Sequence, residues 1–223
     1  MVAIAFVDDD WISVAPGTDP DGAGPATRMG FDAFATVQGA INGTSSGGSV
    51  LVNPGVYSSI TTINKPLTLS STGMWDWCLH RTGEIRVTNG ASNVTIEALN
   101  IEKIVANGAG DNLTIAGNTF FTNSSNGTIV KTSVANRNNW QIIDNANLGS
   151  IRLHNVTDTL VSGNVIYNND TTPGILLNNA PGANIWYNEI LGSGGAGIDR
   201  KNGYKPPPSR GTFGSDVFIE NSA

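Results

Sequence analysis

A short phrase of residues recurs along this chain and restricts its fold more than any other feature. Each copy has two apolar residues separated by one position, then two further residues, an asparagine and another apolar residue. The cleanest copies span 113–120, 140–145, 161–166 and 185–190. The apolar residues alternate with other residues over a few positions, which is the period of a β-strand, and Gly, Asn or Pro then breaks the pattern. The phrase predicts a short strand followed by a tight turn.

The second apolar position of the phrase measures the distance between repeats. Successive positions are 17 to 34 residues apart, so the loops vary while the strand phrase is kept. A second kind of short strand lies between the phrases, as at 149–155, 174–179 and 197–200, with too few residues left for a crossover helix. Like strands are therefore expected to stack in parallel as the coils of a solenoid, roughly 4.8 Å apart. The positions are Val52, Leu69, Ile96, Ile115, Ile142, Val161, Ile185 and Ile219.

The composition agrees with a fold made of many turns. The 223 residues include 27 glycines and 26 asparagines, and only 13% are charged, about half of the usual ~25%. Glycine and asparagine are weak helix formers that tolerate left-handed backbone conformations. The hydrophobic fraction of 39% argues against disorder.

One short helix is predicted near the N-terminus. In the segment 31–42, the side chains of Phe34, Val37 and Ile41 fall on one helical face, and the Asn42-Gly43 pair provides a stop. Such a helix can cover the open end of a coil stack, which otherwise exposes apolar side chains and free strand edges.

Three segments carry a resemblance to a known family. Residues 34–41, 47–57 and 63–69 resemble the capping helix and first coils of right-handed parallel β-helix proteins of the pectin-lyase-like superfamily. The later coils resemble the general repeat of that superfamily, so the similarity covers roughly residues 31–223. The superfamily includes polysaccharide lyases, glycosidases, epimerases, phage tailspikes and noncatalytic surface proteins, so it specifies fold better than function.

The resemblance implies an all-β chain folded as a single-stranded right-handed parallel β-helix, a solenoid of about eight coils with a short N-terminal capping α-helix. Residues 1–48 are then the lead-in and cap, and residues 49–223 are the coils of one continuous domain. Residues 1–30 also resemble the lead-in of large bacterial secreted or surface proteins, which implies a secreted or cell-surface location.

An asparagine column is expected to have a structural role. Asn118, Asn145, Asn164 and Asn188 each stand three residues after the repeat position. Such a column suits a left-handed turn residue whose amide hydrogen-bonds up and down the stack. A catalytic asparagine has no need to recur in successive coils.

Charged residues of the second strand set are the candidate catalytic groups. Alternation points Arg152, His154, Asp199 and Lys201 outward, on the face where enzymes of the superfamily usually hold substrate. A glycosidase needs paired carboxylates, and only one acid is among these residues. A polysaccharide lyase needs a base and a positive group that neutralises a uronate carboxylate. Solvated surface charge is the competing interpretation, and it is favoured here.

Acidic residues gather near the N-terminus at Asp8, Asp9, Asp10, Asp19 and Asp21. Hard cations such as Ca²⁺ prefer oxygen ligands, and the segment 18–22 has part of the spacing of a calcium loop. The alternatives are a calcium site and a solvated cluster of turn residues.

Aromatic residues suggest a place for a glycan. In an extended segment Trp75 and Trp77 lie on one side, where indole faces can receive sugar rings with Arg81 as a hydrogen-bond donor. The competing interpretation is that these rings pack a long loop onto the coils. Trp186 and Tyr187 invite the same two interpretations.

Charge and apolar patterning exclude some classes of partner. The formal net charge of −6 argues against nucleic acid and anionic membranes as partners. No apolar run reaches the length of a membrane span, so membrane insertion is not expected. The single cysteine, Cys78, excludes a disulfide scaffold.

The sequence thus favours a noncatalytic β-helix module of a secreted or cell-surface protein, a rigid structural or adhesive surface that binds glycans. The first alternative is a polysaccharide lyase or related carbohydrate-active enzyme. The second is a subunit of a self-assembling fibre, because the strand phrase near Ile219 has no polar cap after it and can associate end to end. No cofactor other than calcium is expected.

Overall fold

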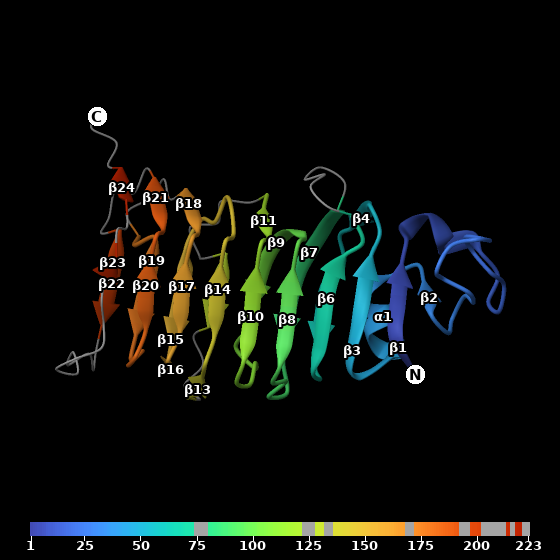
Figure 1. The fold of residues 1–223 in the computed structure, drawn as a ribbon, viewed down its shortest axis with the longest axis horizontal. Coiled ribbons are helices and arrows are strands. Elements are labelled where there is room, and N and C mark those ends of the chain that lie inside the picture. Colours follow the sequence, from blue (N-terminus) through green and yellow to red (C-terminus); the bar gives the residue numbers. More distant parts are fainter. Residues whose placement is uncertain are drawn as a thin grey trace.

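The computed structural model describes residues 1–73, 80–121, 128–131, 136–167, 172–191, 197–201, 213–214 and 217–219. Short strands stand side by side along the longest axis, in nearly the order of the sequence (Figure 1). Most of the described chain is β structure, and α1 (Val37–Gly43) is its single α-helix.

Two long parallel sheets form the body of the molecule. Sheet A contains, in spatial order, β2 (Ala33–Phe34), β1 (Val2–Val7), β3 (Thr44–Val52), β6 (Leu67–Ser71), β8 (Val94–Glu97), β10 (Leu113–Ala116), β14 (Gln141–Ile143), β17 (Leu160–Ser162), β20 (Asn184–Trp186) and β23 (Phe213–Gly214). Sheet B contains β22 (Ile198–Lys201), β19 (Ile175–Asn178), β15 (Ile151–His154), β12 (Ile129–Lys131), β9 (Asn100–Val105), β7 (His80–Val87) and β4 (Gly55–Tyr57).

Shorter strands complete the β structure. β5 (Thr61–Ile63) pairs with β7, and β11 (Thr119–Phe120) pairs with β9. A third sheet contains β18 (Val165–Tyr167), β21 (Glu189–Leu191) and β24 (Val217–Ile219), and β13 (Arg137–Asn138) pairs with β16 (Val156–Thr157). From β6 to β23 the chain returns in turn to sheets A and B, with the short strands β11, β13, β16, β18 and β21 in between. Within the two long sheets, strands from successive repeats pair in parallel. This arrangement is compatible with a parallel β-helix.

Six of the eight repeat positions read from the sequence lie in one register column of sheet A. The column runs Val50, Leu69, Ile96, Ile115, Ile142, Val161, Ile185 and Phe213. Val52 was a wrong choice, because Val50 and Val52 are both fully buried and alternation does not distinguish them. Ile219 was also wrong, since it pairs with Leu191 in the third sheet.

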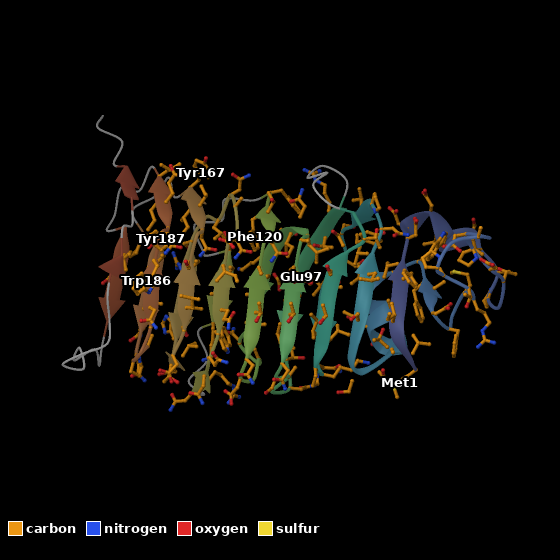
Figure 2. All side chains as sticks on the ribbon, in the orientation of Figure 1. Met1, Glu97, Phe120, Tyr167, Trp186 and Tyr187 are labelled. Carbon is orange, nitrogen blue, oxygen red and sulfur yellow. The ribbon has the colours of Figure 1, made fainter. Side chains whose placement is uncertain are left out.

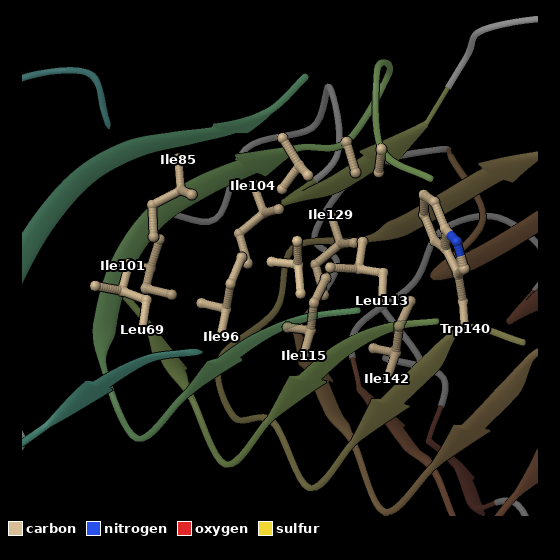
Figure 3. Close-up of a cluster of buried hydrophobic side chains, with 14 of the residues drawn as sticks. Leu69, Ile85, Ile96, Ile101, Ile104, Leu113, Ile115, Ile129, Trp140 and Ile142 are labelled. Atoms are coloured by element: carbon tan, nitrogen blue, oxygen red, sulfur yellow. The ribbon is translucent and has the colours of Figure 1, made fainter. Parts of the chain in front are cut away.

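The core lies between the two long sheets. Phe120 of β11 is fully buried in the middle of the row of strands (Figure 2). Figure 3 shows Ile96 and Ile115 of sheet A on one side of the core and Ile104 and Ile129 of sheet B on the other. The inward column of sheet B is Thr61, Ile85, Ile104, Ile129, Ile151, Ile175 and Ile198. Stacked β-branched residues thus supply most of the apolar burial.

Asn118, Asn145, Asn164 and Asn188 form a buried, hydrogen-bonded column, as their spacing predicts. The Oδ1 of Asn145 accepts from both the backbone N and the Nδ2 of Asn118, at 3.1 Å each. The same pair of bonds joins Asn145 to Asn164 and Asn164 to Asn188. Each Nδ2 also donates to a backbone carbonyl of sheet A, such as Ile96 O at 2.9 Å. The column therefore satisfies buried backbone groups at the bend that leaves sheet A.

The prediction that these asparagines are themselves left-handed is wrong. The residues with positive φ stand one position earlier, at Gly117, Asp144, Gly163 and Tyr187. The preceding residue makes the sharp bend in the backbone. The asparagine itself has an ordinary backbone conformation, in which its amide points inward.

Helix α1 lies at the N-terminal end of the stack and is shorter than predicted. It begins after Thr36, whose side chain accepts from Gly39 N, because Ala33 and Phe34 are extended and pair with β1. The helix packs against β1 and β3. The side-chain amide of Gln38 accepts from Thr62 N at 2.7 Å and donates to Thr62 O at 3.2 Å. It thus supplies hydrogen-bond partners to the backbone at one edge of β5. The boundary proposed at residue 48 falls inside β3.

Replacing one asparagine of the buried column tests its contribution to stability. Asn145→Ala removes bonds to Asn118, Ile115 and Asn164 and leaves buried N–H and C=O groups without partners. We expect the free energy of unfolding in urea to fall by about 3 kcal/mol.

Asn139→Gly is the matched control for that variant. Asn139 is exposed, has positive φ, and donates to Asn112 Oδ1 at 2.8 Å. Glycine keeps the backbone conformation, so we expect a change below about 0.5 kcal/mol. Equal losses for the two variants contradict a special role for the buried column.

Candidate functional site

Arg152, His154 and Asp199 lie partly exposed on strands of sheet B, and Lys201 stands on the same strand as Asp199. Arg152 pairs in register with Leu176, which pairs with Asp199. His154 pairs with Asn178, which pairs with Lys201, and the side chain of Lys201 lies outside the described residues. The four residues therefore stand in two neighbouring columns, on β15 and β22. One strand separates β15 from β22, so the Cα atoms of Arg152 and Asp199 are roughly 10 Å apart.

His154 is held among cationic groups. Burial lowers the pKa of its imidazole, and the nearby charges of Lys131 and Arg152 lower this pKa further. The Nδ2 of Asn178 lies 3.4 Å from His154 Nδ1. These neighbours favour the neutral imidazole, which is the form that a general base needs.

Lys131 was not found among the candidates from the sequence. It is fully buried, and its Nζ donates to the carbonyl oxygen of His154 at 2.7 Å. Its register partner in β15 is Leu153, an inward core residue. Burial lowers the pKa of Lys131 to about 8, with a smaller contribution from the charge of Arg137. Alternation with Ile129 is the signal that could have placed this lysine inside.

Asp8, Asp9 and Asp10 come together, as their sequence suggests. One carboxylate oxygen from each lies within 4.8 Å of the others. These carboxylates also hold the short 3₁₀ helix η1 (Asp9–Ser13) in place: Asp8 Oδ1 accepts from Asp10 N, and Asp9 Oδ2 accepts from Val56 N, both at 3.0 Å. Calcium binding by this cluster stays a prediction.

Asp19 and Asp21 are used in a separate turn. Asp19 Oδ1 accepts from Asp21 N at 3.2 Å and from Gly22 N at 2.9 Å, and Asp21 Oδ2 accepts from Ala26 N at 3.3 Å. In the part of the chain that the structure describes, these two residues do not belong to the metal-sized group of Asp8, Asp9 and Asp10.

The aromatic candidates are only partly described. Trp75 and Trp77 lie outside the described residues. Arg81 is exposed, and its guanidinium carbon lies 4.9 Å from the centre of the Phe121 ring, a cation–π contact. Trp186 and Tyr187 are neighbours at the surface, with ring centroids 6.3 Å apart and an interplanar angle of 40°.

The chain matches no protein-family model, no curated protein and no solved structure. Among the described residues there is also no helix long and apolar enough to cross a membrane. Any functional assignment therefore depends on the geometry of the chain itself.

The buried lysine makes the stability of the protein depend on pH. Between pH 8 and pH 10.5 the unfolded chain holds a proton that folded Lys131 has released, so the free energy of unfolding should rise with pH across this window. Lys131→Met keeps the volume and removes the titration. We expect the difference in unfolding free energy between wild type and variant to change by about 2–3 kcal/mol from pH 8 to pH 10.5, measured by urea unfolding. If the unfolding free energies of the two proteins change with pH in the same way, the lowered pKa of Lys131 is contradicted.

Proposed function

We propose that this chain is a right-handed parallel β-helix of about eight coils and serves as a noncatalytic module of a secreted or cell-surface bacterial protein. It presents a rigid surface, and the ligand of that surface is a glycan. In this proposal residues 1–48 act as lead-in and cap, and residues 49–223 form the coils.

Two observations support the handedness and the coil number. Parallel strands of one sheet are joined by right-handed crossovers in almost all proteins, because the twist of the strands favours that direction. Sheet A contributes one strand to each proposed coil, from β3 through β23.

The observation that carries the proposal is the use of polar side chains for stacking. In addition to the buried asparagine column, exposed asparagines also pair. Asn112 Nδ2 donates to Asn93 Oδ1 at 2.9 Å, and Asn139 Nδ2 donates to Asn112 Oδ1 at 2.8 Å. Asn179 Nδ2 donates to Asn155 Oδ1 at 2.6 Å. These amides bind their equivalents in the next coil, so they stiffen a long surface. A stiff, weakly charged surface suits recognition of an extended, uncharged ligand.

A polysaccharide lyase that uses Arg152, Asp199 and Lys201 is the second candidate. The register of sheet B, which sets these residues on β15 and β22 two strands apart, favours it. Arg152 and Lys201 then bind or deprotonate a uronate, and the neutral imidazole of His154 lies close to Arg152.

A lyase assay separates the two candidates. We expect no unsaturated product when the protein is incubated with polygalacturonate or alginate, and we expect the protein to sediment with insoluble polysaccharides. Formation of product that Arg152→Ala abolishes favours the lyase instead. Arg86→Ala is the matched control, because Arg86 is an exposed arginine in the same register column of sheet B. Loss of product with both variants rules out a specific role of Arg152.

A further inference from the structure

One tryptophan in the described residues faces outward, and it is paired with an exposed tyrosine. Trp11 and Trp140 are buried, and Trp140 Nε1 donates to Gly110 O at 2.9 Å. Trp186 is partly exposed at the end of β20, and Tyr187 is 65% exposed. Figure 2 shows both side chains near the C-terminal end of the row, with Tyr167 of the preceding repeat above them in the view.

Tyr187 holds a backbone conformation that tyrosine rarely adopts. Its φ is 54°, in the left-handed region, at the bend where other repeats have Ala98, Gly117, Asp144 and Gly163. An aromatic residue in this region costs of order 1–3 kcal/mol. Most of the ring stays in solvent, so little apolar burial offsets that cost. Folding alone therefore gives no reason for tyrosine at this bend.

Among the described residues, the neighbours of the two rings in the sheet and along the chain are small or polar. The register neighbours of Trp186 in sheet A are Ser162 and Gly214, both small. Glu189 lies two residues after Tyr187 and is partly exposed, whereas the next residue, Ile190, is buried. In the described part of the chain no protein group binds the Tyr187 hydroxyl. Two neighbouring aromatic rings are thus followed within two residues of the chain by a partly exposed carboxylate.

We propose that Trp186, Tyr187 and Glu189 form a binding site for the pyranose rings of a neutral polysaccharide. This inference rests on the proposed function and names its site and ligand class. The C–H faces of a pyranose pack on aromatic rings, while its hydroxyls donate to the Glu189 carboxylate and exchange hydrogen bonds with the Tyr187 hydroxyl. Glu189 and the net charge of −6 disfavour a uronate chain at the same place.

Indole N–H signals in the NMR spectrum of the whole ¹⁵N-labelled chain provide the first test. Cellohexaose and xylohexaose are the neutral probes, and a galacturonate hexamer is the charged comparison. The signal lost in Trp186→Ser identifies Trp186. We expect a neutral hexamer to shift this signal saturably and to leave the buried Trp140 signal in place, while the uronate binds at least about threefold more weakly.

Tyr187→Gly separates binding from folding. Glycine removes the ring and relieves the left-handed strain, so the thermal midpoint should stay the same or rise. The Kd for the neutral hexamer should nevertheless increase about threefold to tenfold, as should that of Trp186→Ser. The matched control is Ile12→Ser, which removes an exposed apolar side chain near the N-terminus and should leave the Kd unchanged.

The outcomes distinguish the site from the function. If the protein sediments with polysaccharide but Trp186 does not shift and Tyr187→Gly binds like wild type, this site is wrong and the proposed function stands. If the protein binds no polysaccharide in either assay, both proposals are overturned. A shift of the Trp186 signal that depends on protein concentration alone assigns the pair to a contact with a second copy, and it also overturns the glycan site.

Discussion

The whole architecture depends on satisfying buried backbone groups where the chain bends out of sheet A. Parallel strands satisfy one another along the sheets, but the bend interrupts that ladder in every repeat. In four successive repeats a left-handed residue turns the chain, and the asparagine after it binds buried N–H and C=O groups near the bend. Because each amide in this column also binds the amide of a neighbouring repeat, the column favours a fixed register between these repeats. The loops between strands can then vary in length without disturbing the stack.

The sequence predicts the parts of the fold that depend on alternation. The repeat positions from Leu69 to Ile185 lie in register, since β-branched residues at every second place report directly which face is buried. Alternation fails where two neighbouring inward residues are alike, as at Val50 and Val52. It also does not show where a helix begins, because pairing of Phe34 with β1 depends on a strand far away in the sequence.

The candidate site was predicted less well than the fold, for a physical reason. The column of Arg152 and Asp199 follows from residue spacing, but the environment of His154 depends on Lys131, which comes from a different strand. Lysine usually lies at the surface, so the residue type argues against the buried place that Lys131 holds. The strain at Tyr187 was also hidden, because sequence spacing identified the asparagine after it as the turn residue.

The contact between Gln38 and Thr62 bears on how the protein avoids aggregation. A parallel sheet that ends in an unpaired strand offers its N–H and C=O groups to any extended chain in solution. On β5 a glutamine amide from α1 already takes both backbone groups of the middle residue. A foreign strand that approaches this edge must first displace a side chain held by a packed helix. The helix that packs on the apolar core thus also covers this edge of β5.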